Sequence, residues 1–485
     1  MPYPGYPYAQ THPDRLATLA TLFGLESPAL DRCRVLELGC GDATNLVSMA
    51  LSLPDASFVG VDAARAAVDR GRALIDGLGL ANVALETRTL EQFEPSPGSF
   101  DYVVAHGVYS WVAAPVRDRL LELCRCALSE RGVAYVSYDV LPGGRLKQIL
   151  RDMLLFHTAA VQDPGERLDQ ARSLLAFLIE GWSAEHEFGA LMSRHAERLL
   201  ERSDETLFHD ELAADNEPVY FHQFAAHAAR HGLQYLAEAD FFEMQTGVLP
   251  EPASEELTGV ADPLIQEQYL DFLKGRMFRQ TLLCGAEYPL DRSPRPQLLM
   301  HLAVSSPARP AGARAQDGRT TIEGPSGATL TTGHPLVIQG LERVGTSWPG
   351  GVWVRDLLPD EIEDHDREAV CDALLRCYAA NLVHLHVRLP MLTTSASERP
   401  EASPLARQQA RTGPLVTNLR HEVVRVEDAL GRRLVTLLDG SRDRAALVNE
   451  LRAYVPEADL REPPAIEAGL DRSLEGLASL ALLRA

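Results

Sequence analysis

A glycine turn flanked by carboxylates is the stretch of this 485-residue chain whose residue types point most directly to chemistry. In "VLELGCGDATNL", residues 35–46, an apolar run leads into Gly39 and Gly41, with Glu37 before the turn and Asp42 after it. Glycine lets the backbone approach a ligand closely. The two carboxylates disfavour a pyrophosphate, which binds backbone N–H groups at a helix N-terminus where no negative charge competes.

The spacing of the turn and of a later carboxylate narrows the choice of ligand. Thr44 stands where the third glycine of a GxGxxG dinucleotide motif belongs. S-adenosylmethionine has no phosphate and carries a positive sulfonium and a positive ammonium, so Glu37 suits it. Asp62 ends the run "FVGVD", 21 residues after Gly41, where a carboxylate accepts hydrogen bonds from both ribose hydroxyls. We predict an S-adenosylmethionine site, with a dehydrogenase or a turn that only packs as the alternatives.

Aromatic residues follow a later strand-like run, in "AHGVYSWV", residues 105–112. Methyl transfer needs a positioned, deprotonated nucleophile and no catalytic triad. We predict Tyr109 and Trp111 as catalytic residues whose electron-rich rings guide an amine toward the sulfonium. The alternative is that they only cover the sheet edge. His106 is either a base or, as we favour, part of the lining of the cofactor pocket together with Gly107.

The elements that must position these residues are visible in the pattern of residues 34–140. Five short β-branched runs, "RVLELG", "ASFVGVD", "VALETRT", "FDYVVAHG" and "GVAYVSYD", alternate with amphipathic helical stretches. This alternation predicts a parallel, doubly wound α/β sheet. Ligands of such sheets bind beyond the carboxyl ends of the strands. The glycine turn, Asp62, Thr89, the His106 region and Tyr138 are therefore expected along one edge.

The rest of the chain divides by periodicity and composition. Apolar residues at three- and four-residue spacing predict a helical insertion, after which the α/β rhythm returns. Stretches rich in Pro, Gly, Ala and Ser predict linkers. The expected units are an N-terminal segment with the cofactor-binding core (1–150), a helical insertion (151–217), the last elements of the sheet (218–293), a linker (294–329), a winged-helix-like unit (330–391), a second linker (392–414) and a second winged-helix-like unit (415–485).

Charge and cysteine usage argue against several classes of protein. A formal net charge of −22 repels nucleic acid and anionic membranes, and no segment approaches the roughly 20 apolar residues that span a bilayer. The seven cysteines contain no CxxC pair, which argues against a disulfide framework and favours a cytoplasmic protein. His227 and His231 lie four residues apart, yet no recognisable third ligand accompanies them, so we predict no metal.

The glycine turn and Asp62 resemble motifs I and II of the Rossmann-like S-adenosylmethionine-dependent methyltransferases. The resemblance extends over nearly the whole chain to a bacterial family with a methyltransferase regulatory domain, through "QTHPDRLATLATLFGL", "AHGVYSWV", "NEPVYFHQFAAHAARHGLQYLAEADF", "EQYLDFLKGRMFRQTLLC" and "TNLRHEVVRV". It implies an α/β fold, with a Rossmann-like methyltransferase sheet, a helical insertion and C-terminal helical or winged-helix-like domains.

The resemblance also implies roles for individual residues. The N-terminal segment would fold over the cofactor, with Tyr8, Thr11 and His12 as contacts. Thr89 and Leu90 stand where many members carry an acidic residue that binds the adenine amino group. Backbone contacts to the methionine part of the cofactor are implied for Gly39, Cys40 and Gly41.

Some members of the family are protein-lysine methyltransferases that use a helical region for dimerisation. The resemblance therefore implies methyl transfer to protein lysine side chains, and it is compatible with a homodimer. The rival functions are a methyltransferase acting on a small molecule or natural product, and a non-catalytic regulator that binds S-adenosylmethionine.

Overall fold

A mixed seven-stranded sheet forms the centre of the chain in the computed structural model, which describes residues 5–312, 315, 317–454 and 463–484. The strand order is β3-β2-β1-β4-β5-β7-β6, and β1 to β5 run parallel while β7 is antiparallel to both of its neighbours. This confirms the predicted sheet. The strands are β1 (Arg34–Leu38), β2 (Ser57–Asp62), β3 (Val83–Thr87), β4 (Phe100–Ala105), β5 (Leu128–Asp139), β6 (Leu233–Glu238) and β7 (Phe278–Gly285).

Helices cover the sheet, and the order of its strands places a crevice at the carboxyl edge. The central strand β4 is buried along its whole length, as expected for a parallel strand with packed elements on both faces. The order of the strands reverses at β1, which pairs with β2 on one side and β4 on the other, so a crevice opens beyond their carboxyl ends. The helices of this part are α1 (Pro13–Leu22), α2 (Thr44–Ser52), α3 (Arg65–Leu78) and α4 (Ala114–Ala127).

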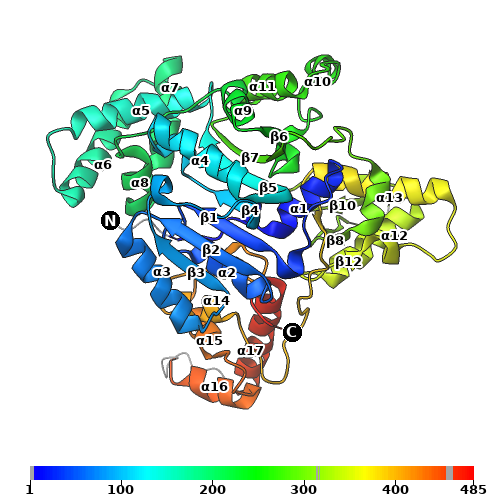
Figure 1. Cartoon of the computed structure of the whole chain (residues 1–485). Coiled ribbons are helices and arrows are strands. Elements are labelled where there is room, and N and C mark those ends of the chain that lie inside the picture. The colour runs from blue at the N-terminus through cyan, green and yellow to red at the C-terminus, as the bar shows by residue number, and fades with distance from the viewer. Residues whose placement is uncertain (1–4, 313–314, 316, 455–462, 485) are drawn as a thin grey trace.

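The predicted helical insertion follows β5 and has a small apolar core of its own. It projects from one side of the sheet (Figure 1), after which the chain returns to add β6 and β7 to the same sheet. The insertion comprises α5 (Gly144–His157), α6 (Pro164–Gly181), α7 (Glu187–Leu200) and α8 (Asp204–Glu211), and the returning segment carries α9 (Phe221–Arg230), α10 (Glu251–Thr258) and α11 (Pro263–Lys274).

Residues 294–329 are not the linker that their composition predicted. Strand β8 (Ala303–Ser305) is fully buried and lies between β12 (Val352–Trp353) and β13 (His384–His386), so this segment belongs to the middle unit. A strand of three residues is too short to show a period in the sequence. The unit also contains β9 (Arg309–Pro310), β10 (Thr320–Glu323), β11 (Thr329–Thr332), α12 (Pro335–Ser347) and α13 (Asp364–Ala379).

The C-terminal unit begins within the second predicted linker and packs on the methyltransferase-like sheet. Leu405 of α14 (Pro404–Gln409) is buried against Val47 of α2 and Ile75 of α3, and Figure 1 shows this unit beside those helices. Its other elements are β14 (Leu415–Thr417), β15 (Val423–Arg425), α15 (Ala429–Leu437), α16 (Arg444–Arg452) and α17 (Pro463–Ser479). Among the described helices, none is both long and apolar enough to cross a membrane.

Candidate cofactor and acceptor site

The glycine turn forms an open cradle after β1. Gly39 and Gly41 have φ values of +77° and +56°, a region that favours glycine. A Cβ atom on Gly39 would lie 2.5 Å from Cγ2 of Val108, whereas no described atom lies within 4 Å of a Cβ built on Gly41 or Gly107. The backbone of the turn therefore borders space on the side of Gly41 and Gly107. Burial raises the pKa of the Cys40 thiol well above its ordinary value, so the thiol stays protonated.

Asp62 lies at the end of β2 and holds this turn in place. Its carboxylate accepts hydrogen bonds from the backbone N–H groups of Gly41 (2.9 Å) and Ala64 (2.7 Å). A carboxylate has about four acceptor positions, so two more hydrogen bonds, such as those from ribose hydroxyls, can still be accepted. Asp42 is engaged differently, because it accepts from the N–H and hydroxyl of Thr44 at the start of α2.

Glu37 brings a buried carboxyl group to the same turn. One of its oxygens accepts a hydrogen bond from Asn45 Nδ2 (2.8 Å), and the other, Oε2, is buried without a partner among the described residues. The pKa of Glu37 is raised to about 8, mainly by burial and also by the nearby carboxylates of Asp42 and Asp62, while the hydrogen bond from Asn45 opposes the rise. An unpartnered carboxyl oxygen next to an open glycine turn fits the ammonium group of S-adenosylmethionine, which would stabilise the ionised form.

The N-terminal segment crosses the glycine turn, as the resemblance implied. A Cβ atom on Gly5 would lie 2.0 Å from the Asp42 carboxylate, so the backbone passes directly over this residue. The N–H of Tyr8 donates to Asn45 Oδ1 (2.9 Å), and the hydroxyl of Thr11, in the 3-10 turn Ala9–Thr11, also bonds Asn45. Tyr8 and Thr11 thus lie at the site.

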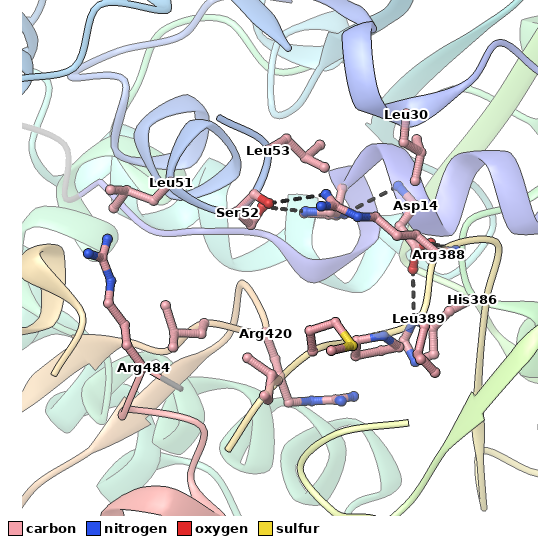
Figure 2. Close-up of a pocket in the computed structure, with 15 residues that line it drawn as sticks. Asp14, Leu30, Leu51, Ser52, Leu53, His386, Arg388, Leu389, Arg420 and Arg484 are labelled. Atoms are coloured by element: carbon pink, nitrogen blue, oxygen red, sulfur yellow. Dashed lines mark hydrogen bonds and ion pairs between the residues drawn. The ribbon is translucent and has the colours of Figure 1, made fainter. Parts of the chain in front are cut away.

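His12 faces a different part of the molecule. Its Nδ1 accepts from the N–H of Asp14 at the start of α1, and its Nε2 pairs with the hydroxyl of Ser52 at 3.0 Å. His12 and Ser52 line a second cavity of about 360 Å³ between α1, the end of α2 and the two C-terminal units, where Arg388 and Arg420 are also found (Figure 2). The side-chain hydrogen bonds of His12 thus lie toward this cavity, although its ring is also 5.4 Å from that of His421. Its contact with the cofactor stays a prediction.

A group of aromatic side chains lies at the carboxyl end of β4, and we use the name aromatic rim for Tyr8, His106, Tyr135 of β5 and Phe278 at the start of β7. The rings of Tyr8 and His106 are stacked with centroids 3.6 Å apart, and His106 also contacts the rings of Tyr135 and Phe278. Burial lowers the pKa of His106 to about 3, so its ring is neutral. A histidine with this pKa is a poor general base near neutral pH, and the lining role that we favoured agrees with the geometry.

Tyr109 and Trp111 lie in a 3-10 turn after β4, but Tyr109 points into the protein core. Its ring packs against Tyr138 and Phe224, only 3% of the residue is exposed, and its hydroxyl bonds His227 Nδ1 at 2.8 Å. The packing alternative therefore describes Tyr109 better than the predicted catalytic role. The reason is α9, which returns from more than 100 residues later to cover this ring.

Trp111 does contact cations, but they belong to its own chain. Lys147 Nζ of α5 lies 4.7 Å from the centre of the Trp111 ring, and the guanidinium of Arg151 lies 5.6 Å from it. Lys147 is also paired with Asp139 at 3.1 Å. The electron-rich face predicted for an acceptor amine is thus covered by the helical insertion.

Thr89 and Leu90 follow β3 on the same edge of the sheet. The Thr89 side chain caps the short turn Leu90–Gln92, whose Gln92 side chain bonds back to the N–H of Thr89. Leu90 is largely buried. The structure places both residues next to the end of β2, where Asp62 lies, because β2 and β3 are paired in register.

Two residues that the sequence reasoning did not assign complete the site. Asn45 binds Glu37, Tyr8 and Thr11, and its Oδ1 also lies 2.9 Å from Nε2 of His421 in the β14–β15 loop. An amide oxygen only accepts, so Nε2 of His421 donates and its Nδ1 accepts from the hydroxyl of Ser48. His421 is buried and has a φ of +60°, which is unusual for a residue with a side chain.

The only signal for His421 in the sequence was its place in "TNLRHEVVRV", to which no chemistry was attached. It lies 376 residues from Asn45 along the chain. The contact joins the C-terminal unit to the residues that hold Glu37.

This fold and site define a Rossmann-like methyltransferase, and comparisons with known proteins agree. Residues 36–134 match a methyltransferase domain family, residues 203–285 a family described as a predicted methyltransferase regulatory domain, and residues 398–481 the C-terminal winged helix domain of PKMT proteins. The last match confirms the predicted C-terminal winged helix. It begins at residue 398, before the predicted start at residue 415. An uncharacterized protein of Rickettsia prowazekii, RP789, is 30% identical over 484 residues, which cover 95% of this chain and 86% of that protein.

The solved structure of PKMT2 from Rickettsia typhi is similar over the full length of both chains, with a TM-score of 0.89 and 25% identity. Its complex with AdoHcy gives a TM-score of 0.88, covering 99% of this chain and 100% of that one. The chain belongs to the family of S-adenosylmethionine-dependent methyltransferases with a methyltransferase regulatory domain. It is accordingly a methyltransferase, and S-adenosylmethionine is its cofactor.

Proposed function

We propose that this methyltransferase transfers methyl groups to lysine side chains of a protein substrate. The observation that carries the proposal is the similarity to PKMT2 over the whole chain, including the helical insertion, the middle unit and the C-terminal winged helix. A small-molecule methyltransferase needs only the sheet and a pocket, whereas this likeness includes every accessory unit. The bound cofactor supplies an electrophilic methyl group on a sulfonium, and the residues of the chain position it and the acceptor.

The acceptor entrance is proposed at the aromatic rim. Phe278 opens β7 and is 42% exposed beside His106, and its register partner is Asp139 at the end of β5. A cavity of about 720 Å³ continues from Phe278 past Glu238 and Glu243, with apolar lining from Phe242, Val248, Leu249 and Met277. The apolar side chains suit the alkyl part of a lysine, whereas the two carboxylates are paired with Lys274, Arg276 and Arg279, which also line this cavity.

The rim then favours the reactive form of the acceptor. An amine that leaves water for an apolar aromatic surface has a lowered pKa, so it loses its proton to solvent more easily. Its nitrogen lone pair forms a bond to the methyl carbon while the carbon–sulfur bond breaks, and the sulfur leaves as a neutral thioether. The neutral ring of His106 lines this path without having to accept the proton.

The lysine content of the chain supports the proposed acceptor. Only two of its 46 basic residues are lysines, Lys147 and Lys274. Lys147 is paired with Asp139, and Lys274 donates to the carbonyl of Glu243 at 2.6 Å. Their side chains are 16% and 12% exposed. A lysine-modifying enzyme with this composition presents no exposed lysine to a second copy of itself.

An assay with methyl-labelled S-adenosylmethionine and cell extract tests the acceptor. We expect label in protein, and we expect it to be lost when the lysines of the extract have first been blocked by chemical dimethylation. The Asp62→Ala variant is the control for cofactor-dependent labelling. Label that enters small molecules, or that enters protein equally after lysine blocking, would contradict the proposal.

We also propose that the chain forms a homodimer through its helical insertion. Phe156 of α5, Phe177 of α6 and Phe188 of α7 are 86%, 68% and 50% exposed, which is unusual for phenylalanine in a monomer. Light scattering of the full chain should give the mass of a dimer, and Phe156→Glu should give a monomer. A monomeric wild-type protein contradicts this proposal.

A cytoplasmic location is proposed from the cysteines. All seven, which lie in the described part of the chain, are unpaired, as expected in a reducing compartment. Fractionation of cells that produce the protein tests the proposal.

A further inference from the structure

Two histidines and an aspartate from distant elements meet outside the cofactor site. His227 lies on α9, His231 directly follows that helix, and Asp118 lies on α4. The Nε2 atoms of His227 and His231 lie 3.2 and 3.0 Å from the same oxygen of Asp118, and one ligand atom from each residue lies within 4.8 Å of the others. We propose that this triad binds a divalent transition metal, with zinc as the preferred ion.

The geometry of the triad suits a tetrahedral ion. With ligand bonds of about 2.0–2.1 Å, two ligand atoms of a tetrahedral zinc site are about 3.4 Å apart. Both nitrogen–oxygen distances in the triad are within a few tenths of an ångström of that separation. An ion can therefore enter by side-chain adjustment alone, and three protein ligands leave the fourth position to water.

The surroundings of His227 resemble those of a metal ligand. Its second ring nitrogen, Nδ1, lies 2.8 Å from the hydroxyl of Tyr109. A metal-bound histidine donates its other N–H to an oxygen, which fixes the orientation of the ring. On metal binding the single ring proton of neutral His227 would lie on Nδ1 instead of Nε2, and the oxygen of Tyr109 would accept a hydrogen bond from it. This gives the buried hydroxyl of Tyr109 a role that the packing alone does not.

The charges around the triad permit a cation. The two histidine side chains are largely buried, while the Asp118 side chain is 60% exposed and leaves a path for the ion. Arg230 is the nearest opposing charge on the same helix, and its side chain is exposed, so solvent screens it.

The bound ion would join two of the matched family segments. Asp118 lies in the methyltransferase domain, and both histidines lie in the regulatory segment at residues 203–285. Tyr109 lies only three residues after His106 of the aromatic rim. A metal in the triad would thus fix α9 to α4 and hold the loop that leads from the rim, independently of which acceptor the enzyme uses.

The test is zinc binding to the full-length, tag-free protein after treatment with a chelator. We expect saturable binding of one Zn²⁺ by calorimetry, a higher melting temperature, and visible absorption bands of tetrahedral Co²⁺ when cobalt replaces zinc. His231→Ala and Asp118→Asn should each lower zinc affinity at least tenfold, since even residues that only orient a metal ligand usually account for about 10- to 100-fold. His222→Ala, which removes an exposed histidine of the same helix, is the matched control and should leave zinc affinity unchanged.

Affinity for AdoHcy, measured in metal-free protein, checks that each variant is folded. Asp118 is exposed, so its replacement by asparagine should preserve the fold. The proposal is overturned if the wild type shows no saturable zinc binding, or if Asp118→Asn and His231→Ala bind zinc as tightly as the His222→Ala control.

Discussion

Glu37 is the residue whose protonation we expect to depend most directly on the cofactor. Its pKa of about 8 lies above the ordinary 4.5, because the side chain is buried beside other carboxylates. Between these two values the folded protein holds more protons than the unfolded chain, so the contribution of Glu37 to stability decreases as the pH rises through that window. A cation bound next to Oε2 reverses this preference.

We therefore expect the affinity for AdoHcy, which carries the same ammonium group, to increase as the pH rises from 6.5 to 8, with at most a tenfold gain per pH unit. Above pH 8 the gain from Glu37 should cease, because the carboxylate is already ionised. Calorimetry in a series of buffers measures this profile. Glu37→Gln removes the titrating group and should abolish this pH dependence of AdoHcy affinity. If the Glu37→Gln variant keeps the wild-type pH profile, another group is responsible for it.

Asp62 is predicted to bind the ribose, and its carboxylate also holds the glycine turn. We expect Asp62→Ala to weaken AdoHcy binding by roughly 1.5 to 3 kcal/mol, the usual range for hydrogen bonds to a charged group. The loss includes the contact that holds Gly41. Asp69→Ala, an exposed change on α3, is the control for calorimetric measurements. Equal affinities of the Asp62 and Asp69 variants would place the ribose elsewhere.

Phe278 and Tyr109 provide a paired test of where the acceptor lies. Phe278→Ala should lower turnover of a lysine substrate at least tenfold and leave AdoHcy affinity within a few-fold, because we expect its exposed ring to contact the acceptor and not the cofactor. Tyr109→Phe should leave turnover within a few-fold, since the hydroxyl points to His227. Steady-state kinetics on both variants measures these effects. A large loss of turnover in Tyr109→Phe, with little change in Phe278→Ala, would support the catalytic role that the sequence predicted for Tyr109.

The β14–β15 loop of the C-terminal unit contacts the residues that hold Glu37 at the glycine turn, through His421. We expect His421→Ala to lower AdoHcy affinity several-fold and to cost about 1–3 kcal/mol of stability, because Asn45 and Ser48 lose a buried partner. His421→Gln keeps a side-chain donor and should recover part of both losses. Arg425→Ala, exposed on the same hairpin, is the control in calorimetry and urea unfolding. Loss of stability with unchanged AdoHcy affinity would limit His421 to a packing role.

The helices and strands also show which parts of the fold can be predicted from local sequence patterns. The five parallel strands and the insertion were predictable because each shows its period within a few residues. Strand β8 was not, because three buried residues in a Pro- and Gly-rich segment carry no period. The C-terminal unit begins before residue 415 because Ala406 of α14, together with the flanking Ala402 and Ala410, belongs to the apolar core of that unit, whereas composition placed this segment in a linker.

The whole molecule should respond to its cofactor as a folded unit. AdoHcy binds only the folded site, so it should raise the melting temperature by mass action, whereas NAD should not. Differential scanning calorimetry at equal ligand concentrations provides the comparison. An equal shift with NAD would contradict the cofactor assignment, since the carboxylates at the turn would then tolerate a pyrophosphate.

The sequence alone determined the sheet, the glycine turn and the Asp62 position, because strand ends and turns depend on residues that are neighbours in the chain. Only the tertiary structure decided which side chains share a site. Tyr109 is buried beneath α9, His12 lines another cavity, and His421 contacts Asn45, which is 376 residues away in the sequence. Asp118 likewise met His227 and His231 through folding. Such contacts depend on the packing of distant elements, and no local pattern records that packing.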